Sequence, residues 1–198
     1  MNDIRKAIDE LRSKYEVLQD NKLPIDIFTF AEVDLGLNLI PFDDLKAKYD
    51  VDAALQGDFS AIYVDAEQYD LMERGPIWKL RRLRFSLAHE LGHFFLHKDH
   101  PGYVSAVQDF TNWTNSNSSE KYRVEMEANE FAGALLVPTQ RLKELYSEFE
   151  AKASSVIPNF KESETLRSGF CESATGVFQV GTLTIGIRLD RDLIWEAN

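Results

Sequence analysis

The sequence predicts an α+β fold in which helices predominate and a small mixed β-sheet packs against one central helix. Three observations lead to this prediction. Apolar residues recur at helical spacing over much of the chain, two short runs have the character of strands, and one long apolar helix carries two histidines and a glutamate. At 198 residues, the chain is long enough for one domain of ordinary size with a small appendage.

Residues 2–19 begin the chain as a predicted amphipathic helix, because their apolar side chains recur every three or four positions. A second helix is predicted over 24–35. Pro24 suits the first helical position, where its missing N–H costs nothing, and Gly36 suits the position that ends a helix.

Two strands and the central helix follow. Residues 37–42 and 59–64 are short apolar runs rich in strand-forming residues, and both are predicted strands. Residues 77–97 are predicted to form the central helix, which is apolar on most sides and therefore buried. The segment 100–119 is rich in Asn, Ser and Thr and is predicted to be a long loop, either one that closes over a cleft or a disordered excursion on the surface.

The second half of the chain is predicted to be mainly helical. One helix is expected over 119–136, ended by Pro138, and another over 139–152. Residues 182–191 are ambiguous, because apolar residues alternate there as in a strand while the glycines in this part of the chain weaken a helix.

The composition restricts the classes of partner. The formal charge is 22 − 33 = −11, which repels nucleic acid and anionic lipid, so direct nucleic-acid binding is not expected. The lone Cys171 cannot form an internal disulfide and is expected to be a small buried side chain. No signal peptide or membrane span is recognisable, which favours a cytoplasmic location.

The central helix carries the motif His-Glu-x-x-His. On a helix, His89 and His93 project from one face about 6 Å apart, so their imidazoles can bind one Zn²⁺ ion from the same side. Glu90 is turned about 100° around the axis, which suits a base that takes the proton of the metal-bound water. The spacing therefore predicts a catalytic zinc site.

A catalytic zinc ion needs a third protein ligand, and no suitable histidine remains. Glu125 and Glu127 on the helix over 119–136 are the candidates, and they point in nearly opposite directions. Glu125 shares its stripe with small residues that allow close helix packing, whereas Glu127 lies one turn from Glu130 on a face expected to be solvated. Glu125 is therefore favoured, with Asn129 as the hydrogen-bond partner that orients a ligand imidazole.

The remaining polar residues near the motif have less certain roles. His97 is too far along the helix to share a metal ion with His89 and is expected to be structural or to line the rim. His100 precedes Pro101 and is expected in a turn. The hydrogen-bond donor for a developing oxyanion stays open among Tyr63, Tyr103, Tyr122 and His97.

Two segments together resemble the ImmA/IrrE family of bacterial zinc metallopeptidases. They are RRLRFSLAHELGHFFLH, which contains the motif, and EMEANEFAGALLVP, which begins at Glu125. The second segment matches the family pattern of a glutamate three residues before Ala-Asn, which independently favours Glu125. The likeness covers residues 24–140 well and is thinner towards the C-terminus.

The resemblance implies a zincin-like metallopeptidase domain over residues 1–152, with core motifs over 24–140, and a small helical extension over 153–198. It favours a helix over 182–191. It also implies zinc-dependent cleavage of a protein substrate, namely a transcriptional repressor with a helix-turn-helix. The alternative is a non-proteolytic regulator of the same fold that acts by binding its partner.

Overall fold

The computed structural model describes residues 2–71, 74–98 and 119–196. It is rich in helices and contains one small sheet, which confirms the predicted fold class. The elements in chain order are α1 (Asn2–Lys14), η1 (Glu16–Leu18), α2 (Ile27–Thr29), η2 (Phe30–Asp34), β1 (Asn38–Phe42), α3 (Leu45–Tyr49), β2 (Ala53–Leu55), β3 (Ala61–Asp65), α4 (Ala66–Asp70), α5 (Ile77–Leu96), α7 (Ser119–Leu136), α8 (Thr139–Ser154), η3 (Phe160–Glu162), α9 (Glu164–Phe178) and α10 (Thr182–Arg191).

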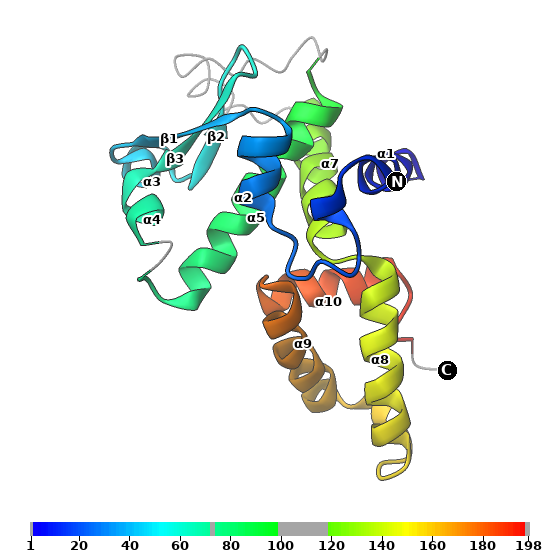
Figure 1. Cartoon of the computed structure of the whole chain (residues 1–198). Helices are drawn as coiled ribbons and strands as arrows, with labels where there is room; N and C mark the ends of the chain where they lie inside the picture. Colours follow the sequence, from blue (N-terminus) through cyan, green and yellow to red (C-terminus); the bar gives the residue numbers. More distant parts are fainter. Residues whose placement is uncertain (1, 72–73, 99–118, 197–198) are drawn as a thin grey trace.

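The sheet has the strand order β1-β3-β2 and lies at one end of the molecule (Figure 1). The central strand β3 is parallel to β1 and antiparallel to β2, so the sheet is mixed, as predicted. Four of the five β3 residues are buried, because both faces of this strand are covered. Strand β2 contacts α5 and forms the edge of the sheet beside that helix.

Helices α5 and α7 pack closely against each other and form the centre of the molecule (Figure 1). Gly92 makes this approach possible. A Cβ atom at position 92 would lie 2.9 Å from the Cα of Ala128, which is closer than real Cβ contacts allow. At the far end of α7, Arg12 of α1 donates to the backbone oxygens of Ala134 and Leu135, at 2.9 and 3.1 Å, and so binds carbonyls that a helix end leaves without partners.

Helices α8, α9 and α10 form the other end of the molecule (Figure 1). Trp195 holds this part together, because its ring contacts four aromatic rings with centroids 5.4 to 6.0 Å away. These four rings belong to Tyr146, Phe149, Phe160 and Phe170. The boundary at residue 152 stays a prediction, since α8 continues to Ser154 and α10 packs on α7.

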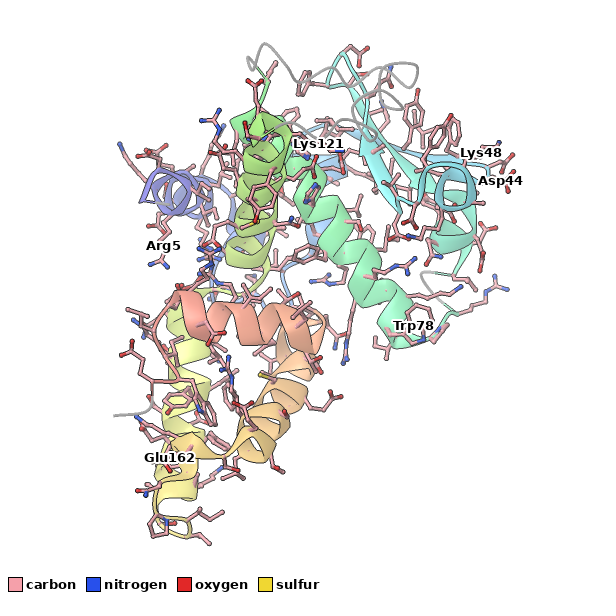
Figure 2. The ribbon with its side chains drawn as sticks, turned by 180° about the vertical axis from the view of Figure 1, so that it is seen from behind. Arg5, Asp44, Lys48, Trp78, Lys121 and Glu162 are labelled. Atoms are coloured by element: carbon pink, nitrogen blue, oxygen red, sulfur yellow. The ribbon has the colours of Figure 1, made fainter. Side chains whose placement is uncertain are left out.

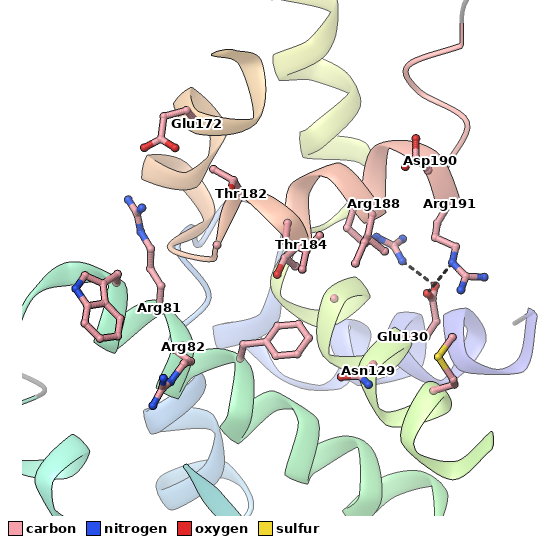
Figure 3. Close-up of a pocket in the computed structure, with 17 residues that line it drawn as sticks. Arg81, Arg82, Asn129, Glu130, Glu172, Thr182, Thr184, Arg188, Asp190 and Arg191 are labelled. Atoms are coloured by element: carbon pink, nitrogen blue, oxygen red, sulfur yellow. Dashed lines mark hydrogen bonds and ion pairs between the residues drawn. The ribbon is translucent and has the colours of Figure 1, made fainter. Parts of the chain in front are cut away.

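A buried ion-pair cluster joins α10 to α7. Arg188 is 1% exposed and donates to Glu130 at 2.7 Å (Figure 3) and to Asp192 at 2.7 Å. Arg5 of α1, labelled in Figure 2, also pairs with Asp192. The prediction that Glu130 lies on a solvated face is therefore wrong, because its side chain is 8% exposed and pairs with an arginine 58 residues away.

The N-terminal helices are shorter than predicted. The helix expected over 2–19 ends at Lys14, because Tyr15 has an extended conformation. The helix expected over 24–35 begins at Ile27, where the Asp26 side chain accepts from the Thr29 N–H and caps it. Pro24 therefore precedes this helix and is not its first residue.

The other predicted elements lie close to their expected positions. The strand expected over 59–64 begins at Ala61, because Phe59 has a φ of 61° in the left-handed region. The helices expected over 119–136 and 182–191 have those bounds. The loop expected over 100–119 lies almost wholly outside the described residues.

Two further expectations concern burial and membranes. Cys171 is buried, as predicted, and burial raises the pKa of its thiol. Among the residues that the structure describes, no helix combines the length and the apolar character needed to cross a membrane.

Candidate metal centre

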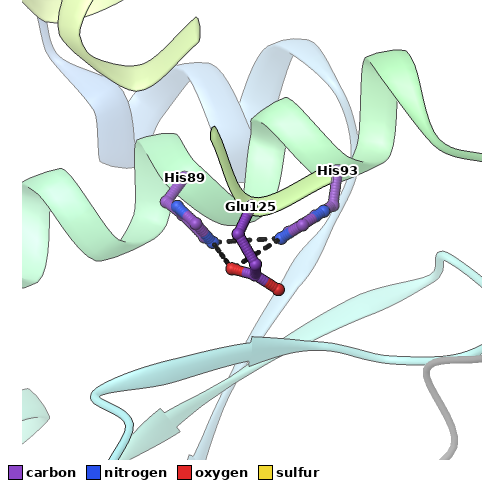
Figure 4. Close-up of side chains that lie close together, drawn as sticks. All are labelled: His89, His93 and Glu125. Atoms are coloured by element: carbon purple, nitrogen blue, oxygen red, sulfur yellow. Dashed lines mark hydrogen bonds and ion pairs between the residues drawn. The ribbon is translucent and has the colours of Figure 1, made fainter. Parts of the chain in front are cut away.

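Three side chains with metal-binding atoms converge where α5 and α7 are packed together (Figure 4). The Nε2 atoms of His89 and His93 lie 3.0 Å apart. Glu125 Oε2 lies 3.2 Å from the first nitrogen and 3.9 Å from the second. The structure thus brings together the two histidines of the motif and the glutamate favoured from sequence, while Glu127 points elsewhere.

These three atoms suit a small divalent cation. Donor atoms bound tetrahedrally to zinc at about 2.0–2.2 Å are about 3.3 Å apart, and the observed separations lie on either side of that value. Two imidazoles and one carboxylate are also a donor set used by catalytic zinc sites, which keep one position open. His93 is buried, while His89 and Glu125 are half-buried, so one side of the centre remains accessible.

Asn129 orients the first imidazole. Its Oδ1 lies 3.1 Å from His89 Nδ1 and can only accept a hydrogen bond. The His89 hydrogen therefore sits on Nδ1, which leaves the Nε2 lone pair directed at the centre. This contact is the one expected from the sequence, and it comes from the helix that also carries Glu125.

A second relay orients the other imidazole. His97 Nε2 lies 3.0 Å from Glu127 Oε2, and a carboxylate accepts, so His97 carries its hydrogen on Nε2. His97 Nδ1 is then the acceptor for His93 Nδ1, 3.0 Å away. His93 consequently keeps the lone pair on Nε2 for a metal ion.

His97 and Glu127 were not predicted as a pair that supports the site. His97 is 1% exposed and does not line the rim, and its engaged ring nitrogens remove it from the candidates for an oxyanion donor. Its separation of four residues from His93 was a usable signal, because i and i+4 side chains are neighbours on a helix. The contact of Glu127 with His97 depends on how α7 packs against α5, and no spacing in the sequence indicates it.

Glu90 lies beside the centre rather than in it. Its Oε2 accepts a hydrogen bond of 2.8 Å from the backbone N–H of Leu55 in β2. Burial raises the pKa of the Glu90 carboxyl to about 7, against the opposing effect of His89. A buried carboxyl whose pKa is near neutrality can both take and release a proton at physiological pH.

The two imidazoles differ in protonation. Burial, together with the charge of His89, lowers the pKa of His93 to about 3, so His93 is neutral near pH 7. Burial also acts to lower the pKa of His89, but the hydrogen bond that His89 donates to Glu125 and the nearby carboxylates outweigh it and raise the pKa above its ordinary value. A proton on His89 therefore competes with a metal ion.

Zinc affinity is expected to rise with pH until His89, whose pKa is raised, has lost its proton, because zinc displaces that proton. The raised pKa of Glu90 adds to the effect, since a nearby cation favours the ionised carboxylate. Calorimetric titration with zinc in two buffers of different ionisation enthalpy measures the protons released. An affinity that does not change with pH, with no proton release, would contradict this protonation scheme.

Replacing His97 with leucine is expected to lower zinc affinity about 10- to 100-fold, because His93 loses the acceptor that fixes its tautomer. The measurement is a competition titration against a zinc indicator, with the thermal melting point as a check on folding. His97→Asn is the matched control, since its Oδ1 can replace the Nδ1 acceptor, and it is expected to keep most of the affinity. Equal affinity in wild type and His97→Leu would show that the relay does not matter for the metal.

Comparison with known proteins places this centre in a family context. Residues 79–166 match the peptidase family M78, described as the IrrE N-terminal-like domain. The matched range contains both sequence segments that resemble the ImmA/IrrE family, so the resemblance is confirmed. No curated protein matches the chain.

Proposed function

Since residues 79–166 match the IrrE N-terminal-like peptidase domain, which supports metallopeptidase activity, we propose that this protein is a zinc-dependent endopeptidase. His89, His93 and Glu125 hold the metal ion, and Glu90 is the general base. The convergence of two imidazole nitrogens and one carboxylate oxygen carries the proposal, because each nitrogen is turned inwards by its own hydrogen-bond partner.

Zinc, when bound, supplies Lewis-acid chemistry by lowering the pKa of a water molecule and polarising the peptide carbonyl. Glu90 supplies the proton transfers. The Leu55 N–H holds Oε2, and we assign Oε1 to the proton that leaves the attacking water. The same carboxyl then delivers this proton to the nitrogen of the departing peptide segment. Its pKa of about 7 suits both steps.

The outer edge of β2 is the proposed place for an extended substrate. Gln56 N donates inwards to Ala61 O of β3, so the N–H of Leu55 faces outwards, where it donates to Glu90. The edge strand and the base are thus fixed to each other. A peptide that pairs with β2 would bring its carbonyl groups past Glu90. A complex with a peptide inhibitor that shows no main-chain pairing to β2 would refute this part of the proposal.

We further propose that the substrate is a transcriptional repressor with a helix-turn-helix, acting in the cytoplasm. The family supports a protein substrate, and the resemblance to repressor-cleaving peptidases supports this class. The charge of −11 disfavours direct binding of this chain to DNA.

The test incubates the purified protein with repressors encoded beside its gene. We expect one cut in one repressor, with two fragments identified by mass spectrometry, in the presence of zinc and not after chelation. Cleavage that persists after chelation would contradict the zinc mechanism. Binding of a repressor without cleavage, combined with relief of repression in cells, would instead establish the non-proteolytic alternative.

A further inference from the structure

A cavity of about 810 Å³ opens between α5, α7, α9 and α10 (Figure 3). We call it the α5–α10 groove. The residues used below to define it are Trp78, Arg81, Phe85, Met126, Leu183 and Ile187. Its volume lies in the range of sites that bind ligands.

Two of the lining residues connect the groove to the metal centre. On α5, Phe85 lines the groove and lies four residues before His89, so the two side chains are neighbours on one helix face. On α7, Asn129 lines the groove and accepts the hydrogen bond from His89. The groove therefore borders the residues that hold His89 in place.

Apolar side chains in the groove are exposed. Leu183 is 76% exposed and Ile187 is 45% exposed, one turn apart on α10, while Trp78 on α5 is 55% exposed. Large apolar side chains gathered around one cavity are typical of a surface that binds a partner. The groove is thus suited to bulky apolar side chains.

One of the arginines that line the groove has no ion-pair partner among the described residues. Arg82 pairs with Asp52, and Arg188 pairs with Glu130. In contrast, Arg81 forms no ion pair with any residue that the structure describes, and its buried Nε has no hydrogen-bond partner there. Arg81 points into the groove from α5, with Glu172 of α9 on the opposite wall (Figure 3).

We propose that the α5–α10 groove binds the segment of the protein substrate next to the scissile bond. Apolar side chains of that segment pack on Trp78, Leu183 and Ile187, and an acidic side chain pairs with Arg81. Glu172 lies on the opposite wall, so the two walls carry opposite charges. A charged peptide therefore binds in one preferred orientation. This inference rests on the proposed peptidase function and narrows its substrates to peptides with apolar residues and a nearby carboxylate.

The test measures peptide binding on the Glu90→Gln variant loaded with zinc, so that cleavage does not interfere. The probes are fluorescein-labelled peptides built on one apolar sequence, in which a single Asp occupies each position in turn, and a matched set with Lys. We expect fluorescence anisotropy to show that at least one Asp peptide binds about tenfold more tightly than its Lys twin. Arg81→Glu in the same background is expected to reverse that preference.

Two control variants make the result specific. Lys48→Glu reverses a charge on α3, at the sheet end of the molecule (Figure 2), and is expected to change nothing. Leu183→Asn is expected to weaken Asp and Lys peptides alike, whereas Val156→Asn, at an equally exposed apolar residue outside the groove, is expected to weaken neither.

The inference is wrong if no peptide binds, if no peptide distinguishes Asp from Lys, or if Arg81→Glu behaves like Lys48→Glu. Failure of the peptidase proposal is seen separately, as wild-type protein that binds these peptides with the expected charge preference but cuts none of them.

Discussion

Glu90→Gln is expected to lower kcat/KM for substrate cleavage by about 10²- to 10⁴-fold while leaving zinc content unchanged. The amide has the shape of the carboxylate and can still accept from the Leu55 N–H, but it cannot take a proton from water. The measurement combines steady-state cleavage of the identified substrate with zinc analysis of the same samples. The cleavage assay and the zinc analysis are needed together, because a loss of activity can come from loss of the base or from loss of the metal ion.

The matched control is Glu67→Gln, which makes the same substitution at an exposed carboxylate on α4 and is expected to retain full activity. If Glu90→Gln cleaves at the wild-type rate, the base is another residue. If the variant loses zinc together with activity, Glu90 supports the metal centre instead. If wild type and Glu90→Gln relieve repression equally in cells, the protein is better explained as a regulator that acts by binding.

Arg188→Met is expected to lower the free energy of unfolding by about 3–5 kcal/mol. The substitution leaves Glu130 and Asp192 as buried carboxylates without their main counter-charge, in the region where α10 meets α7. Gly133 leaves room for the arginine there, since a Cβ atom at that position would lie 3.3 Å from Arg188 Cδ. Denaturant titration followed by circular dichroism gives the difference in unfolding free energy.

Arg141→Met is the corresponding control on the surface. Arg141 pairs with Glu144 within α8, and both side chains are about two-fifths exposed, so the expected loss is at most about 1 kcal/mol. Similar losses in the two variants would show that burial does not strengthen the Arg188 cluster. If Arg188→Met is as stable as wild type, Arg188 does not hold α10 to α7.

Sequence periodicity predicted the helices that carry the site better than the elements around them. The bounds of α7 agree with prediction because Pro138 marks its end locally, whereas for α10 periodicity left helix and strand open and only the family resemblance favoured the helix. Strand β2 was missed, since three residues are too few to show alternation. That strand nevertheless provides the N–H that fixes Glu90, so part of the site could not be predicted.

The candidate ligands were predictable from helical geometry together with the residues around Glu125. His89 and His93 share a face, and the small residues after Glu125 indicated where α7 approaches α5. Glu130 was wrongly placed on a solvated face, and the contact of Glu127 with His97 was not predicted. Their partners lie on other elements, 30 and 58 residues away, and the spacing within one helix does not reveal such contacts.

Anomalous diffraction from crystals of the zinc-loaded protein, recorded above and below the zinc absorption edge, is the most direct test of the metal centre. We expect one anomalous peak within about 2.0–2.2 Å of the Nε2 atoms of His89 and His93 and of the Glu125 carboxylate. A zinc peak at other residues, or none between these three side chains in a crystal that contains zinc, would contradict it.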